Sequence, residues 1–162
     1  MLIIGAGGIG LRHIKGYTQT GRARLSVVEP DDKKRADMAQ KFALANKYQG
    51  IDQADLSSFD LAVICAPAHT HLPLMTKCIA ADLPFMVEKP LSVFMEGVHV
   101  VLEKVRAKNL LARVGFTRRV ADELQQLHCD IQAKKIGDLK LIYMNSSQEF
   151  PKYRPDFQST YY

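Results

Sequence analysis

Glycines near the N-terminus have the spacing that a dinucleotide pyrophosphate requires. Residues 5–10 read Gly-Ala-Gly-Gly-Ile-Gly and fit the pattern G-x-G-x-x-G. In such a motif the first glycine, Gly5, permits a tight turn, and the second, Gly7, lets a pyrophosphate approach the backbone. The third, Gly10, lets the following helix pack closely on the preceding strand. Glycines also mark ordinary turns, so the pattern alone is a weak signal and its surroundings decide.

The surroundings of the motif strengthen this prediction. An apolar run at Leu2–Ile4 predicts a strand that enters the glycines, and the apolar spacing up to Thr20 predicts a helix that leaves them. The first amides of that helix, at Gly8 and Ile9, would bind phosphate groups. Glu29 follows 19 residues after the last glycine and ends the next predicted strand, where a carboxylate accepts hydrogen bonds from ribose hydroxyls.

Glu29 also indicates which dinucleotide binds. A carboxylate at this position would repel a 2′-phosphate, and the next residues are Pro30 and Asp31, where an NADP site would favour arginine. We therefore expect NAD as the cofactor. The basic residues at 33–35 leave NADP as the less favoured alternative.

Glu88, Lys89 and Pro90 follow a short apolar run at 85–87. If that run is a parallel strand, the three residues lie at the edge where open parallel sheets bind ligands. A partly desolvated amine there could exchange protons with a substrate hydroxyl. The alternative is an ordinary surface pair of opposite charges.

Two histidines, His69 and His71, follow another apolar run that ends at Cys65. A metal site is conceivable, but no acidic or second cysteine partner lies nearby in sequence, so we expect none. We interpret His71 as a neighbour of cofactor or substrate, and His13 on the first helix as structural. The cysteines are predicted to be small buried hydrophobic residues.

Composition and charge exclude several classes of protein. The 162 residues are 47% apolar and 24% charged, which rules out a disordered tail, a collagen-like fibre and a disulfide-stapled mini-protein. Three scattered cysteines favour the reducing cytoplasm, and no apolar run approaches the ~20 residues of a membrane span. The net charge is +5, with six basic and no acidic residues between 104 and 119. Nothing resembling a nucleic-acid module accompanies them, so we expect no nucleic-acid partner. We also expect no membrane partner, because no apolar run is long enough for a membrane span.

The elements that must position these residues alternate between short apolar runs and segments of helical period. This alternation predicts an α/β fold with a parallel sheet covered by helices. The predicted strands are 2–4, 25–28, 47–49, 61–65, 85–87 and 110–116, and the predicted helices are 9–20, 31–45, 71–81 and 92–108. A further helix is predicted at 120–135, with Leu124, Leu127 and Ile131 facing inward. The alternation over 138–147 predicts a strand of a different sheet.

Taken together, these motifs resemble the glucose–fructose oxidoreductase and inositol dehydrogenase family (Gfo/Idh/MocA). The matching segments, in order, are 5–13, 27–31, 66–71, 87–91 and 114–120. The resemblance implies a Rossmann-type doubly wound sheet over 1–117, followed at 118–162 by the start of a truncated α/β substrate domain. It also implies an NAD-dependent oxidoreductase acting on a hydroxyl of a sugar, inositol or related polyol, and a homo-oligomer.

Residue roles follow from the same resemblance. It implies that Lys89 is the catalytic residue and that Glu88 helps to hold the nicotinamide end of the cofactor. The loop from 66 to 71 is expected to do the same through Ala66, Pro67 and His71.

Length is where this sequence departs from the family. Members are roughly twice as long, since a second domain closes the site over the substrate. We therefore expect the chain to be a fragment that is inactive alone. Two alternatives are a dinucleotide-binding module without turnover and a methyltransferase, and the latter gives no reason for the residues at 88–90.

Overall fold

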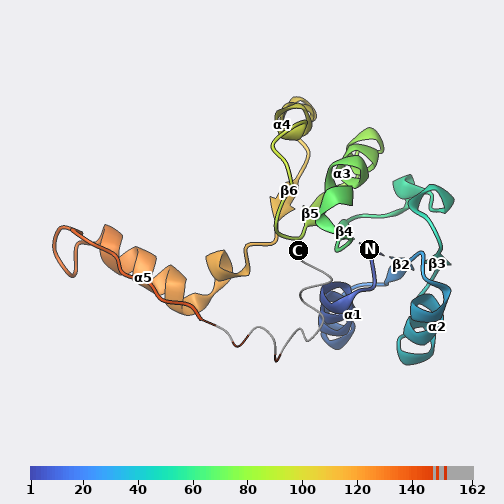
Figure 1. The fold of residues 1–162 in the computed structure, drawn as a ribbon, viewed down its shortest axis with the longest axis horizontal. Helices are drawn as coiled ribbons and strands as arrows, with labels where there is room; N and C mark the ends of the chain where they lie inside the picture. The colour runs from blue at the N-terminus through green and yellow to red at the C-terminus, as the bar shows by residue number, and fades with distance from the viewer. Residues whose placement is uncertain (148, 150–151, 153–162) are drawn as a thin grey trace. The chain divides into compact units, whose positions relative to one another are not determined.

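The computed structural model describes residues 1–147, 149 and 152, and the chain divides into two compact units, Met1–Thr117 and Arg118–Tyr162. The first unit contains a six-stranded parallel sheet with the order β3-β2-β1-β4-β5-β6 (Figure 1). This order is that of a Rossmann fold, which confirms the predicted fold class. The strands are β1 (Leu2–Ile4), β2 (Ser26–Val28), β3 (Lys47–Tyr48), β4 (Ala62–Ile64), β5 (Phe85–Val87) and β6 (Ala112–Val114).

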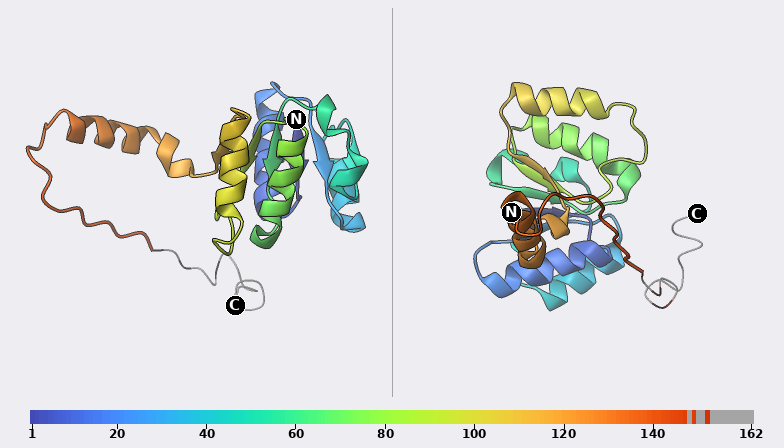
Figure 2. Two further views of the ribbon diagram at one scale, coloured as in Figure 1. Left: turned by 90° about the horizontal axis from the view of Figure 1, so that it is seen from above. Right: turned by 90° about the vertical axis from the view of Figure 1, so that its left-hand side faces the viewer.

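Helices cover both faces of this sheet. The α-helices are α1 (Gly8–Thr20), α2 (Asp32–Lys41), α3 (His71–Ala80) and α4 (Val98–Ala107), and short 3₁₀ turns are η1 (Ile51–Gln53), η2 (Leu56–Ser58) and η3 (Ala68–Thr70). Figure 2 shows α1 and α2 on one face and α3 and α4 on the other. Each face has its own apolar core. Successive side chains of the central strands point to opposite faces, and the helices on each face bury them, so these strands are buried on both sides.

Two helices of the first unit, α2 and α4, are several residues shorter than the sequence predicts. α2 ends at Lys41 and not near Ala45, because the following residues run extended to place Asn46 beside Val27, whose amide donates to the Asn46 carbonyl at 3.0 Å. α4 begins at Val98 and not at Ser92.

The late start of α4 has a local cause. Gly97 precedes the helix in the left-handed conformation, with φ of 76°, and such a residue cannot lie inside a right-handed helix. The Ser92 hydroxyl instead accepts a hydrogen bond from the amide of Phe94.

The second unit departs further from the sequence prediction. A 3₁₀ turn, η4 (Thr117–Val120), leads into it, and α5 (Asp122–Gln132) follows. Residues 138–147 form no strand, and no backbone hydrogen bond links them to another segment within the described part of the chain. Alternating apolar residues make a strand only when a second strand supplies the ladder partners, so that prediction is wrong for this structure.

The side chains of α5 and of residues 138–147 lack a core. The pattern predicts that Leu124, Leu127 and Ile131 face inward, yet Leu124 and Leu127 are exposed and Ile131 is only half-buried. No residue of α5 is buried among the described residues. Leu141 and Tyr143 are 83% and 85% exposed. An amphipathic helix needs a packing partner to bury its apolar face, and that partner does not lie within the described part of this unit.

The three cysteines fall into two groups. Cys65 and Cys78 are buried, and desolvation raises the pKa of each thiol to about 12. Cys129 is exposed, which corrects the prediction that all three are buried.

We expect an alkylating reagent to modify Cys129 at least about tenfold faster than the other two thiols, because the thiolate is the reactive form and burial disfavours it. Peptide mass spectrometry after a timed iodoacetamide pulse at pH 8 measures the three rates. Denaturant should abolish the difference. Equal rates in the folded chain would contradict the burial of Cys65 and Cys78.

Candidate functional site

The glycine turn joins β1 to α1, and two of its glycines are required by close contacts within the protein. Gly5 has φ of 95°, and a Cβ there would lie 2.8 Å from the amide nitrogen of Ala66. A Cβ on Gly10 would lie 1.9 Å from the Gly5 carbonyl oxygen. A Cβ on Gly7, by contrast, would meet no atom within 4 Å. The turn therefore packs tightly against the sheet at Gly5 and Gly10. At Gly7 the backbone is open, so a ligand can approach it closely.

The start of α1 offers hydrogen-bond donors beside this opening. Gly7 is the N-cap and carries no capping side chain, and the amide of Leu11 donates to the Gly7 carbonyl at 2.9 Å. The amides of Gly8 and Ile9 lie in the first turn, where a helix supplies no internal acceptor. No acidic residue occupies that turn. These amides and the positive end of the helix dipole fit a pyrophosphate.

Glu29 lies at the end of β2 and connects the glycine turn to α2. Its side chain is buried, with 7% of the residue exposed. Oε2 accepts a 2.7 Å hydrogen bond from the amide of Ala6, and Oε1 accepts one of 3.1 Å from the amide of Asp31. Each carboxylate oxygen can accept more than one hydrogen bond, so a fixed Glu29 can also receive hydroxyl donors.

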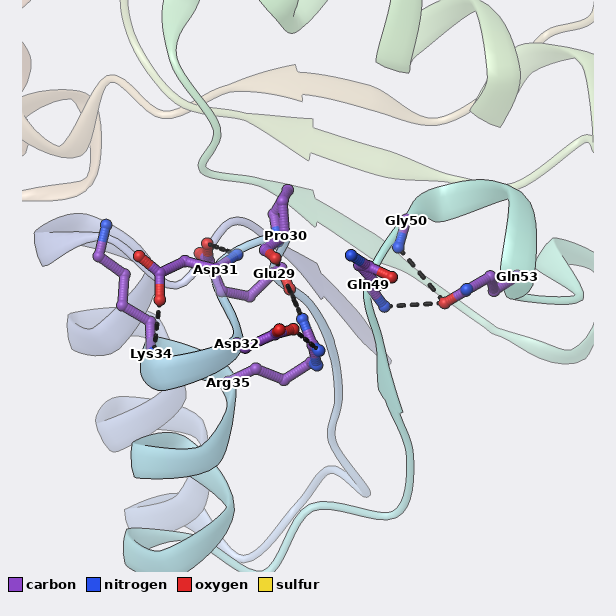
Figure 3. Close-up of polar contacts among 9 residues, drawn as sticks. All are labelled: Glu29, Pro30, Asp31, Asp32, Lys34, Arg35, Gln49, Gly50 and Gln53. Carbon is purple, nitrogen blue, oxygen red and sulfur yellow. Dashed lines mark hydrogen bonds and ion pairs between the residues drawn. The ribbon is translucent and has the colours of Figure 1, made fainter.

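The basic residues that follow Glu29 do not act as one cluster. Arg35 donates through Nη1 to the Glu29 carbonyl at 2.6 Å and pairs through Nη2 with Asp32, as Figure 3 shows. Asp31 caps α2 by accepting from the Lys34 amide at 2.9 Å, which lowers the pKa of its carboxyl group. The guanidinium of Arg35, a candidate for binding a 2′-phosphate, is thus occupied by protein oxygens. Lys33 and Lys34, by contrast, are exposed.

Lys89 lies at the carboxyl edge of the same sheet, directly after β5. The adjoining amide of Glu88 donates to the Ile64 carbonyl at the end of β4, and the amide of Gly115 donates to the Val87 carbonyl after β6. The Lys89 side chain is exposed, and its ammonium has no ion-pair partner among residues 1–147, 149 and 152. Open parallel sheets bind ligands at this edge.

Glu88, the residue before Lys89, is buried. Only 6% of the residue is exposed, and Oε1 lies 2.8 Å from Nε2 of His13 on α1. Sequence reasoning interpreted His13 as structural and did not find this contact. The available signal was spacing, because His13 follows Gly10 by three residues and so shares the face of α1 that packs on the sheet.

His71, at the start of α3, is also buried, with 1% exposed. Its Nε2 lies 2.8 Å from the carbonyl oxygen of Ala66, and its Nδ1 lies 2.9 Å from that of Pro90. Both polar atoms of the ring are therefore directed at the backbone of the protein. Ala66 and the exposed Pro67 border the glycine turn, since Ala66 is the residue that a Gly5 side chain would strike.

Among the described residues, no three His, Cys, Asp or Glu side chains gather closely enough to hold a metal ion. None of the described helices has the length and apolar character to cross a bilayer.

Comparison with known proteins gives consistent results. The family model described as "Oxidoreductase family, NAD-binding Rossmann fold" matches residues 1–116. The chain is 26% identical over 150 residues to the rhizopine catabolism protein MocA of Rhizobium meliloti, covering 92% of this chain and 47% of that protein. It is 29% identical over 149 residues to an inositol 2-dehydrogenase of the same species, covering 89% and 44%. The chain thus spans somewhat less than half the length of these relatives.

A solved structure shows the same fold. The scyllo-inositol dehydrogenase of Lactobacillus casei, with bound NAD(H) and scyllo-inositol, matches with a TM-score of 0.77 and 20% sequence identity. The match covers 85% of this chain and 42% of that one.

Proposed function

Since the chain belongs to the Gfo/Idh/MocA oxidoreductase family, we propose that it is the NAD-binding part of a dehydrogenase that acts on a hydroxyl of a sugar, inositol or related polyol. One observation supports this proposal most directly. The open middle glycine and the uncapped start of α1 lie next to a fixed carboxylate, Glu29, in a sheet of Rossmann order. The named relatives and the polyol in the matched structure support the choice of substrate class.

The residues present fit the cofactor, which when bound would supply the hydride acceptor. The amides of Gly8 and Ile9 would hold its pyrophosphate, and Glu29 would accept hydrogen bonds from the adenosine ribose hydroxyls. As the neutral amine, Lys89 would accept a hydrogen bond from the substrate hydroxyl at Nζ and take up its proton to become the ammonium as the carbon is oxidised. In the reverse direction the ammonium returns that proton to the forming hydroxyl.

We further propose that residues 118–162 begin a substrate domain that also serves homo-oligomer contacts. Apolar side chains are exposed along α5 and around Leu141. This exposure supports the proposal that another part of the protein, or a second copy of it, covers them.

The cofactor preference can be tested directly. We expect NADH to bind at least about tenfold more tightly than NADPH, because a buried carboxylate repels a 2′-phosphate and the nearby Arg35 is occupied. Nicotinamide fluorescence titrations of the full chain give both dissociation constants. Tight NADPH binding without NADH binding would contradict the role of Glu29.

A variant pair sharpens this test. Glu29→Gln removes the charge, so the ratio between the two dissociation constants should fall toward one. Glu96→Gln removes an exposed carboxylate just before α4 and should leave the ratio unchanged.

A further inference from the structure

Two histidines from different helices bind the residues on either side of Lys89. His13 Nε2 lies 2.8 Å from Oε1 of Glu88, and His71 Nδ1 lies 2.9 Å from the carbonyl oxygen of Pro90. Given the role proposed for Lys89, we propose that His13 and His71 are positioning residues, which fix the direction of the Lys89 side chain without touching cofactor or substrate. The proposed function does not include such a role for either histidine.

On the first side, Glu88 carries the connection. A buried carboxylate is costly unless it is hydrogen-bonded, and His13 supplies that partner. The second oxygen of Glu88 accepts a 3.3 Å hydrogen bond from the amide of Lys89, so one carboxylate joins α1 to the lysine backbone. Tyr17 stacks on the His13 ring, with 6.0 Å between ring centroids, and orients it. Gly115 closes the remaining side, since a Cβ there would lie 3.2 Å from Oε1.

On the second side, His71 connects two loops. Its Nε2 binds the carbonyl after β4, at Ala66, and its Nδ1 binds the carbonyl after β5, at Pro90. A carbonyl oxygen only accepts, so the hydrogen bond is donated by the ring nitrogen that carries the proton, while the other nitrogen stays in contact with the second carbonyl. Any displacement of the turn at Lys89 relative to Ala66 must break a contact at a side chain that is 1% exposed.

Lys89 needs this support because no ion pair restrains its side chain among the described residues. The side chain has four rotatable bonds, and no ion pair fixes its ammonium within the described part of the chain. The backbone direction at Lys89 then sets which region Nζ can reach. A displacement of about 1 Å at a reacting group can cost about a hundredfold in rate, so two side-chain contacts that hold the adjoining residues can affect the rate substantially.

The test measures the placement of Lys89 rather than activity. The full chain is treated with an amine-reactive ester, and labelling of Lys89 is quantified by peptide mass spectrometry alone, with NADH and with ADP-ribose, which lacks the nicotinamide. In the unsubstituted chain, saturating NADH should slow labelling of Lys89 about tenfold, and ADP-ribose should not, because only the nicotinamide end reaches the carboxyl edge after β5. The exposed Lys41 serves as an internal reference.

The variants separate positioning from general stability. His13→Leu and His71→Phe should each lose most of the protection by NADH while keeping the ADP-ribose affinity. His13→Gln keeps an N–H group for Glu88 and should restore protection. His99→Gln, at an exposed histidine on α4, should behave as the unsubstituted chain.

Each other outcome has a definite meaning. Full protection in His13→Leu and His71→Phe, or a parallel loss of NADH and ADP-ribose affinity, would overturn the positioning role. If His71→Phe does not fold, the comparison of His13→Leu with His13→Gln decides, because His13 is only partly buried. Failure of the unsubstituted chain to bind either ligand would instead overturn the proposed function.

Discussion

Replacing Gly10 with alanine is expected to cost the first unit about 3 kcal/mol or more of unfolding free energy, at the upper end of the usual overpacking range. The added Cβ would lie 1.9 Å from the Gly5 carbonyl oxygen, and that atom belongs to a backbone that cannot rotate away as a side chain could. Relief requires α1 to move away from β1, which opens the core around Ile14 and Val63. Thermal unfolding followed by circular dichroism should show a fall of roughly 10 °C or more in Tm.

Two matched glycine variants make this prediction specific. Gly16→Ala lies in the same helix with nothing within 4 Å of the new Cβ, so it should raise stability by about 0.5–1 kcal/mol. Gly7→Ala also has room and should leave Tm nearly unchanged, but it should weaken NADH binding because the methyl group enters the space offered to the pyrophosphate. Equal losses of Tm at Gly10 and Gly16 would show that the contact with Gly5 does not cause the loss at Gly10, because helix propensity favours alanine at both positions.

Local patterns predict those parts of the fold in which the interacting segments lie close together in the sequence. The run Leu2–Ile4, the glycines and Glu29 lie close in sequence, and their order specifies one strand–turn–helix–strand unit. Residues 138–147 carry an equally clear alternation, yet a strand depends on a pairing partner that the alternation does not reveal. α2 ends earlier than its pattern predicts for a related reason, because the pairing of β3 with β2 overrides helix propensity after Lys41.

The candidate site shows the same division. The glycine motif and Lys89 could be found from the sequence, because spacing and strand ends identify them. The contact between His13 and Glu88 joins residues 75 positions apart, and no local pattern relates them. Likewise, the sequence places His71 near the cofactor edge but cannot show that both ring nitrogens are directed at backbone carbonyls.

Substitution of Lys89 by methionine is expected to lower kcat for polyol oxidation by about 10²–10⁴-fold, the usual contribution of a positioned proton-transfer group. Methionine keeps much of the length of the side chain and removes the amine. Lys89 is exposed, so Tm should not change, and the dissociation constant for NADH should stay within about threefold because the phosphate and ribose contacts come from α1 and β2. The measurement needs the complete product of the gene that encodes this chain, assayed with NAD and a panel of inositols and sugars.

Lys41→Met is the matched control, since it removes an exposed ammonium at the last residue of α2 and should leave kcat unchanged. A variant at position 89 that keeps its kcat and loses only substrate affinity would show that Lys89 binds the substrate without moving its proton. A complete protein that binds NADH tightly and oxidises no member of the panel would favour the binding module over the dehydrogenase. The decisive quantity is therefore the ratio of the change in kcat to the change in NADH affinity, because a proton-transfer role lowers the first and spares the second.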